Sequence, residues 1–571
     1  MNLSTQKMNY LNNITIASIC FLLISANLQS QYLEKDLNIS RIEEKIDSLF
    51  KDYDLKKPGL AIGIVYQNEL AIQKEYGLAN LEYQIPITNK TSFHVASVSK
   101  QFTSFAILLL EAEGKISLDD DIRKYIPEMN DFGNKISLRN LLNHTSGLKD
   151  QWNLLRLAGW RLDDVIENNQ VLDLIYSQES LNFTPHDEYM YCNSGYTVLA
   201  EIIARVSKKS FAEYMKQNIF IPLKMSNTQF VDKEGIVINN KADSYYKKDN
   251  SYFEDIFNNV SVGATNLSTT IEDLSKWTIN FTNKTIGNEN IFQKMNTLET
   301  LNNGSSFGYA LGQFVNKYKG LTRIEHSGMD ASYQAYLGRF PEQNISIIIA
   351  INRSDINGAR IISQLTDICL KDHFPKQQNS HNPKATFVNK TPIQKNVNEL
   401  KFFEGYYWNY KDNYSRQIAI EDSRLQYMRG NNDNTVLIPV GENEFEMKTD
   451  EYTSVSFDSR QMRVTLDDGY VILLDKYIPA NYNIKSLSEF EGSYYSKELN
   501  THYQFYTKDC ILYANHPRLG NFKLKAIMKD YFIGKGSFKE IRFIRDVSGK
   551  VISFNVSSSR AKNVLFKKNQ Y

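Results

Sequence analysis

Hydrophobic residues in the first two thirds of the chain recur with helical spacing in some segments and alternate as in a strand in others. Residues 41–54 place their apolar side chains on one helical face. Two strands at 59–66 and 70–76 follow, joined by the polar turn Gln67-Asn68. By the same patterns we expect further helices at 101–113, 138–143, 196–206, 267–281 and 358–370, and further strands at 322–325, 331–338 and 345–351. Strands at both ends with helices between them predict a mixed sheet flanked by helices.

The last third of the chain has a different pattern. Residues 374–398 are polar, contain proline and lack a hydrophobic period, so we interpret them as a linker. Short alternating strands separated by turn signals follow. The motif FEGYY at 403–407 recurs as FEGSYY at 490–495, 87 residues later. A repeat of this length predicts two small all-β barrels or sandwiches in tandem, over 399–480 and 485–571.

The first thirty residues have the pattern of an export signal. Lys7 is the only charged residue before the apolar stretch 14–26, which is too short to span a bilayer comfortably and ends in small and polar residues. A short membrane anchor or a buried helix is the alternative. We therefore expect residues 1–30 to be a signal peptide and the mature protein to be exported, to the periplasm or the medium, without a transmembrane anchor. Bulky Ile19 before Cys20 argues against lipidation.

Composition and charge exclude several classes of function. The chain has 66 Lys and Arg residues against 65 Asp and Glu, so it has no net positive charge that would favour nucleic acid. Its 4 cysteines are too few for a disulfide scaffold, and they lack the paired spacing of a zinc site. The hydrophobic content of 42% is ordinary for a globular protein. Candidate chemistry must therefore be sought in short motifs.

The first motif is Ser97-Val98-Ser99-Lys100. One helical turn places a lysine amine beside a serine hydroxyl, and a partly desolvated neutral amine can take the proton of an attacking serine. The same spacing occurs elsewhere in the chain by chance. Only Ser97 lies between an apolar approach and a helix with a buried face, which makes it the candidate nucleophile.

Two further motifs follow in chain order. In Tyr191-Cys192-Asn193, a tyrosine with a lowered pKa can shuttle a proton and an asparagine can orient Lys100 and the substrate, although Tyr191 is also one of 35 tyrosines and can simply pack. In His326-Ser327-Gly328, a glycine on a strand permits close approach of a ligand, and neighbouring N–H groups can donate to an oxyanion. A lone histidine is more often structural than functional.

In this order and context, the motifs resemble the serine β-lactamase and penicillin-binding-protein superfamily, in its class C-like, peptidase S12-type branch. That branch includes esterases, D-aminopeptidases and D,D-carboxypeptidases. The segments that carry the resemblance are 93–128, 136–148, 191–203, 267–277, 307–312 and 326–342. The resemblance covers a domain at about 41–373. It implies an α/β (α+β) fold with an antiparallel sheet flanked by helices and a helical subdomain, and an active site between them.

The resemblance also implies a role for each motif residue. Ser97 would be the acylated nucleophile, and Lys100 and Tyr191 would share the general-base and general-acid roles. Backbone N–H groups of Ser97 and Met329 would form the oxyanion hole. The expected substrate-binding residues are Asn193, His326, Ser327, Gly328 and Met329. No metal or organic cofactor is needed for this chemistry.

One departure from the family pattern is informative. Many members have Lys-Thr-Gly or Lys-Ser-Gly where this chain has His326-Ser327-Gly328. A permanent ammonium at this position favours a substrate carboxylate, so a histidine there argues against strong β-lactamase activity. The substitution resembles the sequence of the D-aminopeptidase and esterase members. Those D-aminopeptidases also have β-barrel domains after the catalytic domain. A barrel loop that selects the substrate and barrels that serve as spacers or wall-binding modules are equal alternatives.

We therefore predict an exported serine hydrolase that acts on an amide or ester through an acyl-serine intermediate. The substrate would be a D-amino-acid peptide, an ester or a peptidoglycan-derived peptide. The alternatives are a penicillin-binding D,D-carboxypeptidase, a weak β-lactamase, a penicillin sensor without turnover and a surface-binding protein. The expected partner is a small-molecule or peptide substrate, with cell-wall peptides among the candidates, and not nucleic acid. The sequence does not indicate an oligomeric state.

Overall fold

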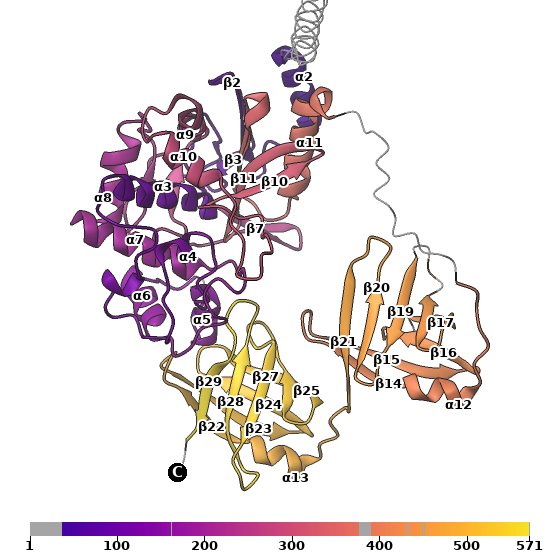
Figure 1. Cartoon of the computed structure of the whole chain (residues 1–571). Helices are drawn as coiled ribbons and strands as arrows, with labels where there is room; N and C mark the ends of the chain where they lie inside the picture. The colour runs from indigo at the N-terminus through magenta and orange to yellow at the C-terminus, as the bar shows by residue number, and fades with distance from the viewer. Residues whose placement is uncertain are drawn as a thin grey trace, which may run out of the picture.

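A computed structural model describes residues 37–161, 163–375, 390–430, 433–447, 449 and 452–569. The predicted signal peptide, with Cys20, and residues 376–389 of the predicted linker lie outside the described residues. Within the described part, no helix is long and apolar enough to cross a membrane. The chain forms a part that combines a sheet with helices, followed by two barrels (Figure 1).

Six strands form the central sheet, in the order β10-β11-β12-β13-β1-β2. Their bounds are Leu60–Tyr66 (β1), Glu69–Tyr76 (β2), Phe314–Tyr318 (β10), Leu321–Asp330 (β11), Tyr333–Phe340 (β12) and Ile345–Ile351 (β13). Every neighbouring pair is antiparallel, which confirms the antiparallel sheet of the α/β (α+β) class. The mixed sheet expected from the element order alone is wrong. β13 returns to β1 in the opposite direction, with Leu60 opposite Ile351, and the intervening helices are not parallel crossovers.

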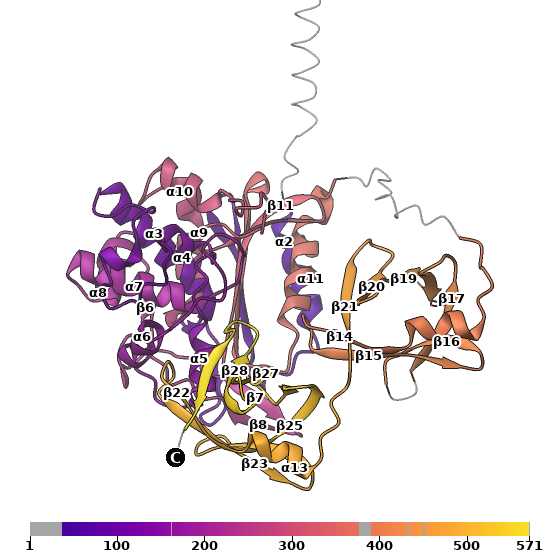
Figure 2. The same ribbon diagram turned by 60° about the horizontal axis from the view of Figure 1, so that its bottom comes forward.

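Helices cover both faces of this sheet. α2 (Ile39–Phe50) and α11 (Gly358–Leu370) pack on one face, and α9 (Ile271–Asn283) packs on the other (Figure 2). The strand β13 is buried along its whole length, which explains its run of isoleucines. α9 begins later than expected because Leu267–Thr269 forms the short strand β9, and the Thr270 hydroxyl caps the helix by accepting from the Asp273 N–H.

The other α-helices of this first part lie beside the sheet on the α9 side (Figure 2). They are α3 (Ser99–Ala112), α4 (Leu138–Leu142), α5 (Gln151–Leu157), α6 (Asn168–Tyr176), α7 (Asn193–Ser207), α8 (Phe211–Met215) and α10 (Glu289–Asn296). Short strands complete this part: β3 (Leu78–Asn80), β4 (Ile85–Pro86), β5 (Phe93–His94), β6 (Gln229–Phe230), β7 (Tyr245–Lys248) and β8 (Ser251–Glu254). α3 is buried on nearly all sides, and Phe102 stacks on Trp277 of α9 with ring centres 4.2 Å apart.

Two closed antiparallel barrels of eight strands each follow, which confirms the tandem all-β prediction. The first is preceded by α12 (Val397–Leu400) and contains β14 (Gly405–Asn409), β15 (Tyr414–Glu421), β16 (Arg424–Met428), β17 (Asn434–Pro439), β18 (Glu444–Met447), β19 (Thr453–Phe457), β20 (Gln461–Thr465) and β21 (Val471–Tyr477). The second is preceded by α13 (Ile484–Leu487) and contains β22 (Gly492–Ser496), β23 (Thr501–Lys508), β24 (Ile511–His516), β25 (Gly520–Met528), β26 (Tyr531–Ile533), β27 (Glu540–Arg545), β28 (Val551–Ser557) and β29 (Val564–Lys568).

The repeated motif starts both barrels in the same way. The Tyr407 hydroxyl donates to the Phe403 carbonyl at 2.8 Å, and the Tyr494 hydroxyl donates to the Phe490 carbonyl at 2.9 Å. The glycine inside each motif has a positive φ, 147° and 134°, which a residue with a side chain rarely adopts. The repeat therefore encodes the turn from the leading helix into the first strand.

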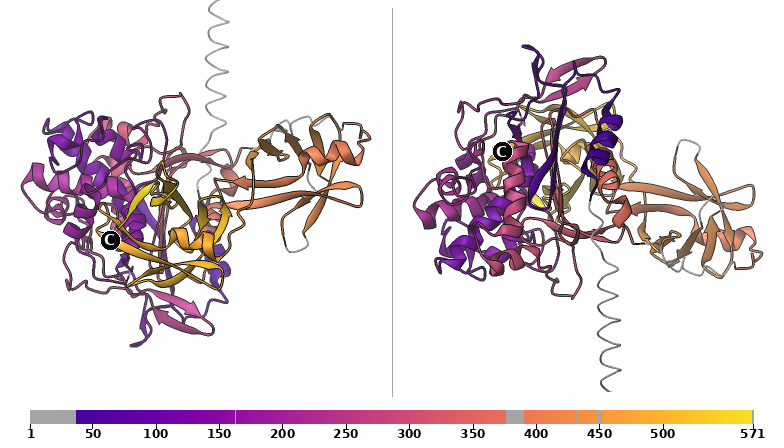
Figure 3. Two further views of the ribbon diagram at one scale, coloured as in Figure 1. Left: turned by 90° about the horizontal axis from the view of Figure 1, so that it is seen from below. Right: turned by 90° about the horizontal axis from the view of Figure 1, so that it is seen from above.

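The second barrel docks on the part that combines the sheet with helices, whereas the first barrel lies to one side (Figure 3). Leu154 and Leu157 of α5 belong to the hydrophobic core of the second barrel, and the Tyr503 hydroxyl donates to the Leu157 carbonyl at 2.9 Å. Lys149, just before α5, forms a salt bridge of 2.7 Å with Glu498, and both side chains are buried. This contact fixes the barrel beside the segment that precedes α5.

Replacing Glu498 by alanine should destabilise the docked barrel by about 3–5 kcal/mol, because it leaves the buried Lys149 ammonium without its counter-ion and with the neutral Ser180 hydroxyl, 3.0 Å away, as an acceptor. Thermal unfolding of the full chain measures this change. Lys497→Ala is the matched control: its side chain is 84% exposed, and its salt bridge to Glu179 is 3.6 Å long. We expect the control to change stability by less than about 1 kcal/mol. Equal effects of the two substitutions would contradict a stabilising role for the buried pair.

Candidate active site

Ser97 lies in a tight turn that leads into α3. The turn spans Ala96–Val98, and α3 begins at Ser99, two residues earlier than expected, so that Lys100 lies in its first turn. All residues from Thr91 to Lys100 are buried except Ser97, which is half-buried. Ala96 has a φ of 45°, which is strained for a residue with a side chain. The strained turn therefore brings the Ser97 side chain out of an otherwise buried segment.

The Lys100 amine is fully buried and has three oxygen neighbours. Nζ is 2.9 Å from Ser97 Oγ, 2.9 Å from Asn193 Oδ1 and 2.7 Å from the Ala264 carbonyl oxygen. A neutral amine has two N–H groups and one lone pair. The amide and carbonyl oxygens only accept, so they take the two N–H groups and leave the lone pair for the Ser97 hydroxyl.

Burial also prepares this amine for proton transfer. Loss of solvation lowers the pKa of Lys100 to about 7, although the carboxylates of Asp330 and Asp150 act in the opposite direction. A pKa near 7 leaves a large part of the amine neutral at neutral pH and still basic enough to accept a proton. The structure thus brings the two ends of the Ser97–Lys100 motif together, in a geometry in which Lys100 can take the proton of the Ser97 hydroxyl.

Tyr191 packs its ring beside the Lys100 amine. Its ring centre is 4.9 Å from Lys100 Nζ. Burial raises the pKa of its hydroxyl well above the ordinary value, and a hydrogen bond with Ser97 only partly offsets this. The lowered pKa on which the expected role of Tyr191 depended is therefore not found. Tyr191 stays a neutral phenol at neutral pH, which suits a proton donor better than a base.

His144 supports the segment that carries Tyr191. The two rings have centres 4.3 Å apart, and His144 Nδ1 accepts a hydrogen bond of 3.1 Å from the Cys192 N–H. The Cys192 side chain is buried and its Sγ lies 3.3 Å from the Leu148 carbonyl oxygen, so Cys192 is a packing residue here. His144 belongs to one of the sequence segments that carry the family resemblance, and its packing gives that segment a structural reason.

Asn193, the first residue of α7, is oriented by Asp150. Asp150 Oδ2 accepts from both the backbone N–H and the side-chain Nδ2 of Asn193, at 2.8 and 2.7 Å. A carboxylate can only accept these hydrogen bonds, so the amide N–H₂ faces Asp150 and the amide oxygen faces Lys100. Asp150 is fully buried. Sequence reasoning missed it because a single aspartate after the 136–148 segment has no distinctive pattern.

The motif on β11 lies against the nucleophile turn. His326 and Gly328 are buried, whereas Ser327 and Met329 are exposed, as strand alternation requires. A Cβ atom on Gly328 would lie 2.3 Å from the Val95 carbonyl oxygen and 2.9 Å from the Ser97 nitrogen. The glycine therefore permits close approach of the nucleophile turn itself. The oxyanion hole formed by the Ser97 and Met329 N–H groups, like the substrate-binding roles of Ser327 and Met329, stays a prediction.

His326 is held in its neutral form. Its Nδ1 lies 2.6 Å from the Ser327 carbonyl oxygen and must donate to it, so Nε2 accepts from the Tyr309 hydroxyl at 3.2 Å. Burial lowers the pKa of His326 to about 3. The neighbouring carboxylate of Glu325 forms a salt bridge of 2.8 Å with Arg323 and not with His326. β11 therefore supplies no cation at this position, and a role of His326 in substrate binding stays a prediction.

A cation reaches the site from the second barrel. Arg560 lies in the loop between β28 and β29, and its carbonyl oxygen accepts from the Asp150 N–H at 2.9 Å. Its guanidinium is 3.6 Å from Asp150 Oδ1 and 5.7 Å from the ring centre of Tyr191, with 30% of the side chain exposed. A barrel loop thus borders the site. No sequence pattern links Arg560 to Ser97.

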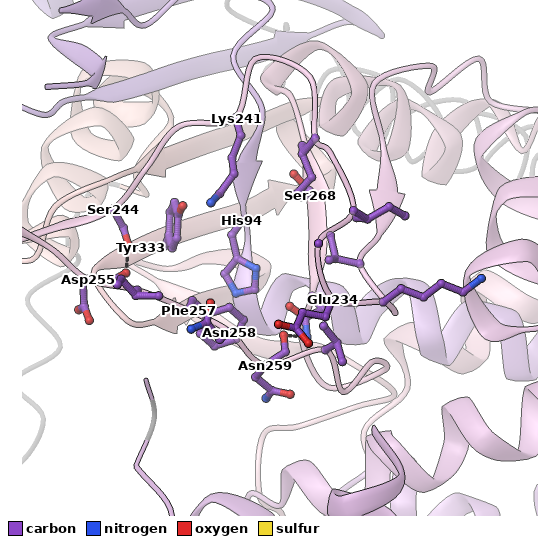
Figure 4. Close-up of a pocket in the computed structure, with 18 of the residues that line it drawn as sticks. His94, Glu234, Lys241, Ser244, Asp255, Phe257, Asn258, Asn259, Ser268 and Tyr333 are labelled. Carbon is purple, nitrogen blue, oxygen red and sulfur yellow. Dashed lines mark hydrogen bonds between the residues drawn. The ribbon is translucent and has the colours of Figure 1, made fainter. Parts of the chain in front are cut away.

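A separate pocket of about 290 Å³ lies next to the nucleophile segment (Figure 4). His94 and Tyr333 form part of its wall, together with charged residues of both signs. Ser97, Lys100 and Tyr191 are not among its lining residues.

Over the ranges that the structure describes, no cluster of three His, Cys, Asp or Glu residues could hold a metal ion.

Comparisons with known proteins agree with this geometry. The family profile described as Beta-lactamase matches residues 42–363. The chain is 24% identical over 319 residues to a D-aminopeptidase of Brucella ovis, covering 56% of this chain and 60% of that protein. It is 26% identical over 307 residues to Penicillin-binding protein 4* of Bacillus subtilis, covering 50% of this chain and 66% of that protein.

Two solved structures share the fold. A penicillin-binding protein homologue from Pyrococcus abyssi, described as octameric, has a TM-score of 0.52 at 21% identity and covers 77% of this chain and 100% of its own. A D-amino acid amidase from Ochrobactrum anthropi SV3 has a TM-score of 0.51 at 19% identity and covers 59% of this chain and 100% of its own.

Proposed function

The chain belongs to the Beta-lactamase family, and from this premise we propose that it is a serine hydrolase that cleaves a D-amino-acid peptide or amide through an acyl-Ser97 intermediate. The observation that carries the proposal is the environment of Lys100. Two acceptor oxygens hold its N–H groups and turn its lone pair toward Ser97 Oγ, 2.9 Å away. A buried amine with a pKa of about 7 in this position is an activated base.

The proposed reaction has two stages. Ser97 Oγ attacks the carbonyl carbon while its proton passes to Lys100, and the carbonyl electron pair moves to the oxygen. The bond to the leaving group then breaks, and the leaving group takes a proton from Tyr191, which Lys100 restores. Water hydrolyses the acyl-Ser97 ester and releases the acid and the free serine. Export of the mature protein is part of the same proposal and is supported by the apolar segment 14–26. A cell-wall-derived substrate is also part of it and is supported by the relative named Penicillin-binding protein 4*.

The position of Arg560 favours a substrate whose leaving group has a carboxylate. Tyr191 is the proton donor to the leaving group in this proposal, and the Arg560 guanidinium lies 5.7 Å from its ring centre. His326 is neutral, so Arg560 and not His326 supplies a positive charge at this end of the site. A guanidinium binds a carboxylate through two parallel hydrogen bonds. The substrate we favour is therefore a short peptide whose last residue leaves with a free carboxylate. A D-residue on the acyl side is supported by the relative named D-aminopeptidase.

A penicillin-binding D,D-carboxypeptidase is the second candidate. Arg560 favours it as well, since both a terminal D-residue and a penicillin present a carboxylate, and one relative is named Penicillin-binding protein 4*. Intact mass after incubation with penicillin separates the candidates. A stable penicillin adduct supports the carboxypeptidase, and an adduct without release of any peptide product supports a sensor.

Arg560→Gln tests the substrate class. We compare kcat/KM for a D-aminoacyl-D-amino acid, whose leaving group has a carboxylate, with that for the corresponding D-aminoacyl amide, which has none. Arg560→Gln should lower the ratio of the two constants by about 10–100-fold, the cost of removing one partner of a charge-assisted pair. Any disturbance of Asp150 affects both substrates and cancels in the ratio.

Lys562→Ala is the control for this test, because Lys562 lies in the same loop and forms a salt bridge of 3.6 Å with exposed Glu188. It should leave the ratio unchanged. A ratio in Arg560→Gln equal to that of the unmodified protein would contradict the carboxylate-binding role.

A further inference from the structure

The far end of β11 has a carboxylate that the acyl-transfer steps do not use. Asp330 is the last residue of β11 and lies on the same face as His326 and Gly328 by strand alternation. That face packs on the nucleophile segment, as the close approach of Gly328 to Val95 and Ser97 shows. The Asp330 charge also contributes to setting the pKa of Lys100. Asp330 therefore belongs to the surroundings of the reacting groups.

The order of residues along β11 gives the site a direction. The His326 ring centre is 6.1 Å from that of Tyr191, the proton donor to the leaving group. Gly328 lies against Ser97. Asp330 is four residues beyond His326, which is about 13 Å along a strand. When the scissile carbonyl is at Ser97 and the leaving group points to Tyr191, the acyl part of the substrate extends toward Asp330.

One oxygen of this carboxylate is already bound, and the other is free. Oδ2 accepts from the Thr265 hydroxyl and lies 3.2 Å from His94 Nε2. No hydrogen bond from any residue in the described ranges reaches Oδ1, and His94 is the only ion-pair partner of Asp330 among them. The side chain is 18% exposed. The His94 ring packs against Tyr333 and Phe257, with ring centres 5.4 and 4.6 Å away, and these contacts hold the imidazole beside the carboxylate.

We propose that Asp330 binds the free α-ammonium group of the N-terminal residue of the substrate, so that the protein hydrolyses peptides from an unblocked amino end. This inference rests on the proposed serine hydrolase function. An ammonium donates charge-assisted hydrogen bonds to a carboxylate, and Oδ1 is placed to accept one. With Arg560 at the leaving-group end, the site has an anion at one end and a cation at the other. This arrangement matches a short peptide with both termini free.

The test uses two substrates with one leaving group, D-alanine p-nitroanilide and N-acetyl-D-alanine p-nitroanilide, with the full chain at pH 7. The unmodified protein should prefer the free amine at least about 100-fold in kcat/KM, because a site built to bind a polar group rejects an analogue that lacks it. Asp330→Asn keeps the shape and removes the charge. We expect it to lose most of this preference while changing kcat/KM for the acetylated substrate by less than about 10-fold.

Asp255→Asn is the matched control, because Asp255 accepts from the nearby Ser332 hydroxyl at 2.7 Å and lies in the wall of the 290 Å³ pocket. It should keep the preference. Equal loss for both substrates in Asp330→Asn would overturn the inference and leave Asp330 as a positioning residue for His94 and Lys100. Equal hydrolysis of both substrates by the unmodified protein would overturn it too, while the serine hydrolase function would stand. Hydrolysis of neither would overturn both.

A measurement on the unmodified protein covers the case in which Asp330→Asn does not fold. D-Alaninol has the ammonium group without a scissile carbonyl, and N-acetyl-D-alaninol lacks the charge. Competitive inhibition of amide hydrolysis by D-alaninol but not by N-acetyl-D-alaninol is the expected result. Equal inhibition constants for the two compounds would overturn the inference.

Discussion

Ser97→Ala should lower kcat by at least about 10⁴-fold, because it removes the only atom that forms the covalent intermediate. The Ser97 side chain is half-buried and its hydroxyl contacts the Lys100 amine, so the substitution removes little packing. The thermal unfolding midpoint should therefore stay close to that of the unmodified protein. Steady-state hydrolysis of a D-aminoacyl p-nitroanilide measures the first effect, and calorimetry measures the second.

Ser99→Ala is the contrasting variant. Ser99 is fully buried, and its hydroxyl donates to the Ala96 carbonyl at 2.6 Å and accepts from the Leu267 N–H at 3.2 Å. Its loss should reduce stability by about 1–3 kcal/mol, the cost of leaving a buried partner unsatisfied, and should leave the nucleophile in place. Turnover by Ser97→Ala within 10-fold of the unmodified protein would exclude the acyl-Ser97 mechanism.

Lys100→Met should have the second largest effect. Methionine has a similar length and tolerates the buried position but cannot accept a proton. We expect kcat/KM to fall by about 10²–10⁴-fold, the usual contribution of a positioned base. Because burial lowers the pKa of Lys100 to about 7, the neutral, active amine increases as the pH rises through 7. The unmodified protein should therefore gain activity between pH 6 and pH 8, and this gain should disappear in Lys100→Met.

Two neighbouring charges give an internal control on this pH dependence. Arg560 lowers the pKa of Lys100 and Asp330 raises it. Arg560→Gln should therefore move the rise in activity to higher pH, and Asp330→Asn should move it to lower pH. A rise in activity that persists unchanged in Lys100→Met would assign it to another group and contradict the role of Lys100 as the base.

Local features of the fold and of the site could be predicted from the sequence. A polar pair between two apolar runs predicts a hairpin turn, and Gln67 and Asn68 adopt positive φ values of 49° and 65° between β1 and β2. The spacing of Ser97 and Lys100 is that of one helical turn, and the structure brings their side chains to 2.9 Å. These features depend on residues close together in the chain, where backbone geometry alone sets the contact.

Features that depend on tertiary structure could not be predicted. The sign of the Tyr191 pKa shift follows from burial against His144 and Tyr309, which come from distant segments. Asp150 has a role because the segment before α5 folds against the start of α7, where Asn193 lies. Arg560 has one because the second barrel docks on α5 and brings its loop to the site. The direction of the strands likewise depends on how β13 meets β1, which the order of elements does not determine.

Intact mass after incubation with a fluorophosphonate tests the acyl-Ser97 mechanism most directly. The oxygen of an activated serine attacks the phosphorus of this reagent and displaces fluoride, which leaves a stable phosphonyl ester on the serine. We expect one adduct on the purified full chain, none on Ser97→Ala and much slower labelling of Lys100→Met. Labelling of Ser97→Ala at the rate of the unmodified protein, or no labelling of the unmodified protein at all, would contradict this mechanism.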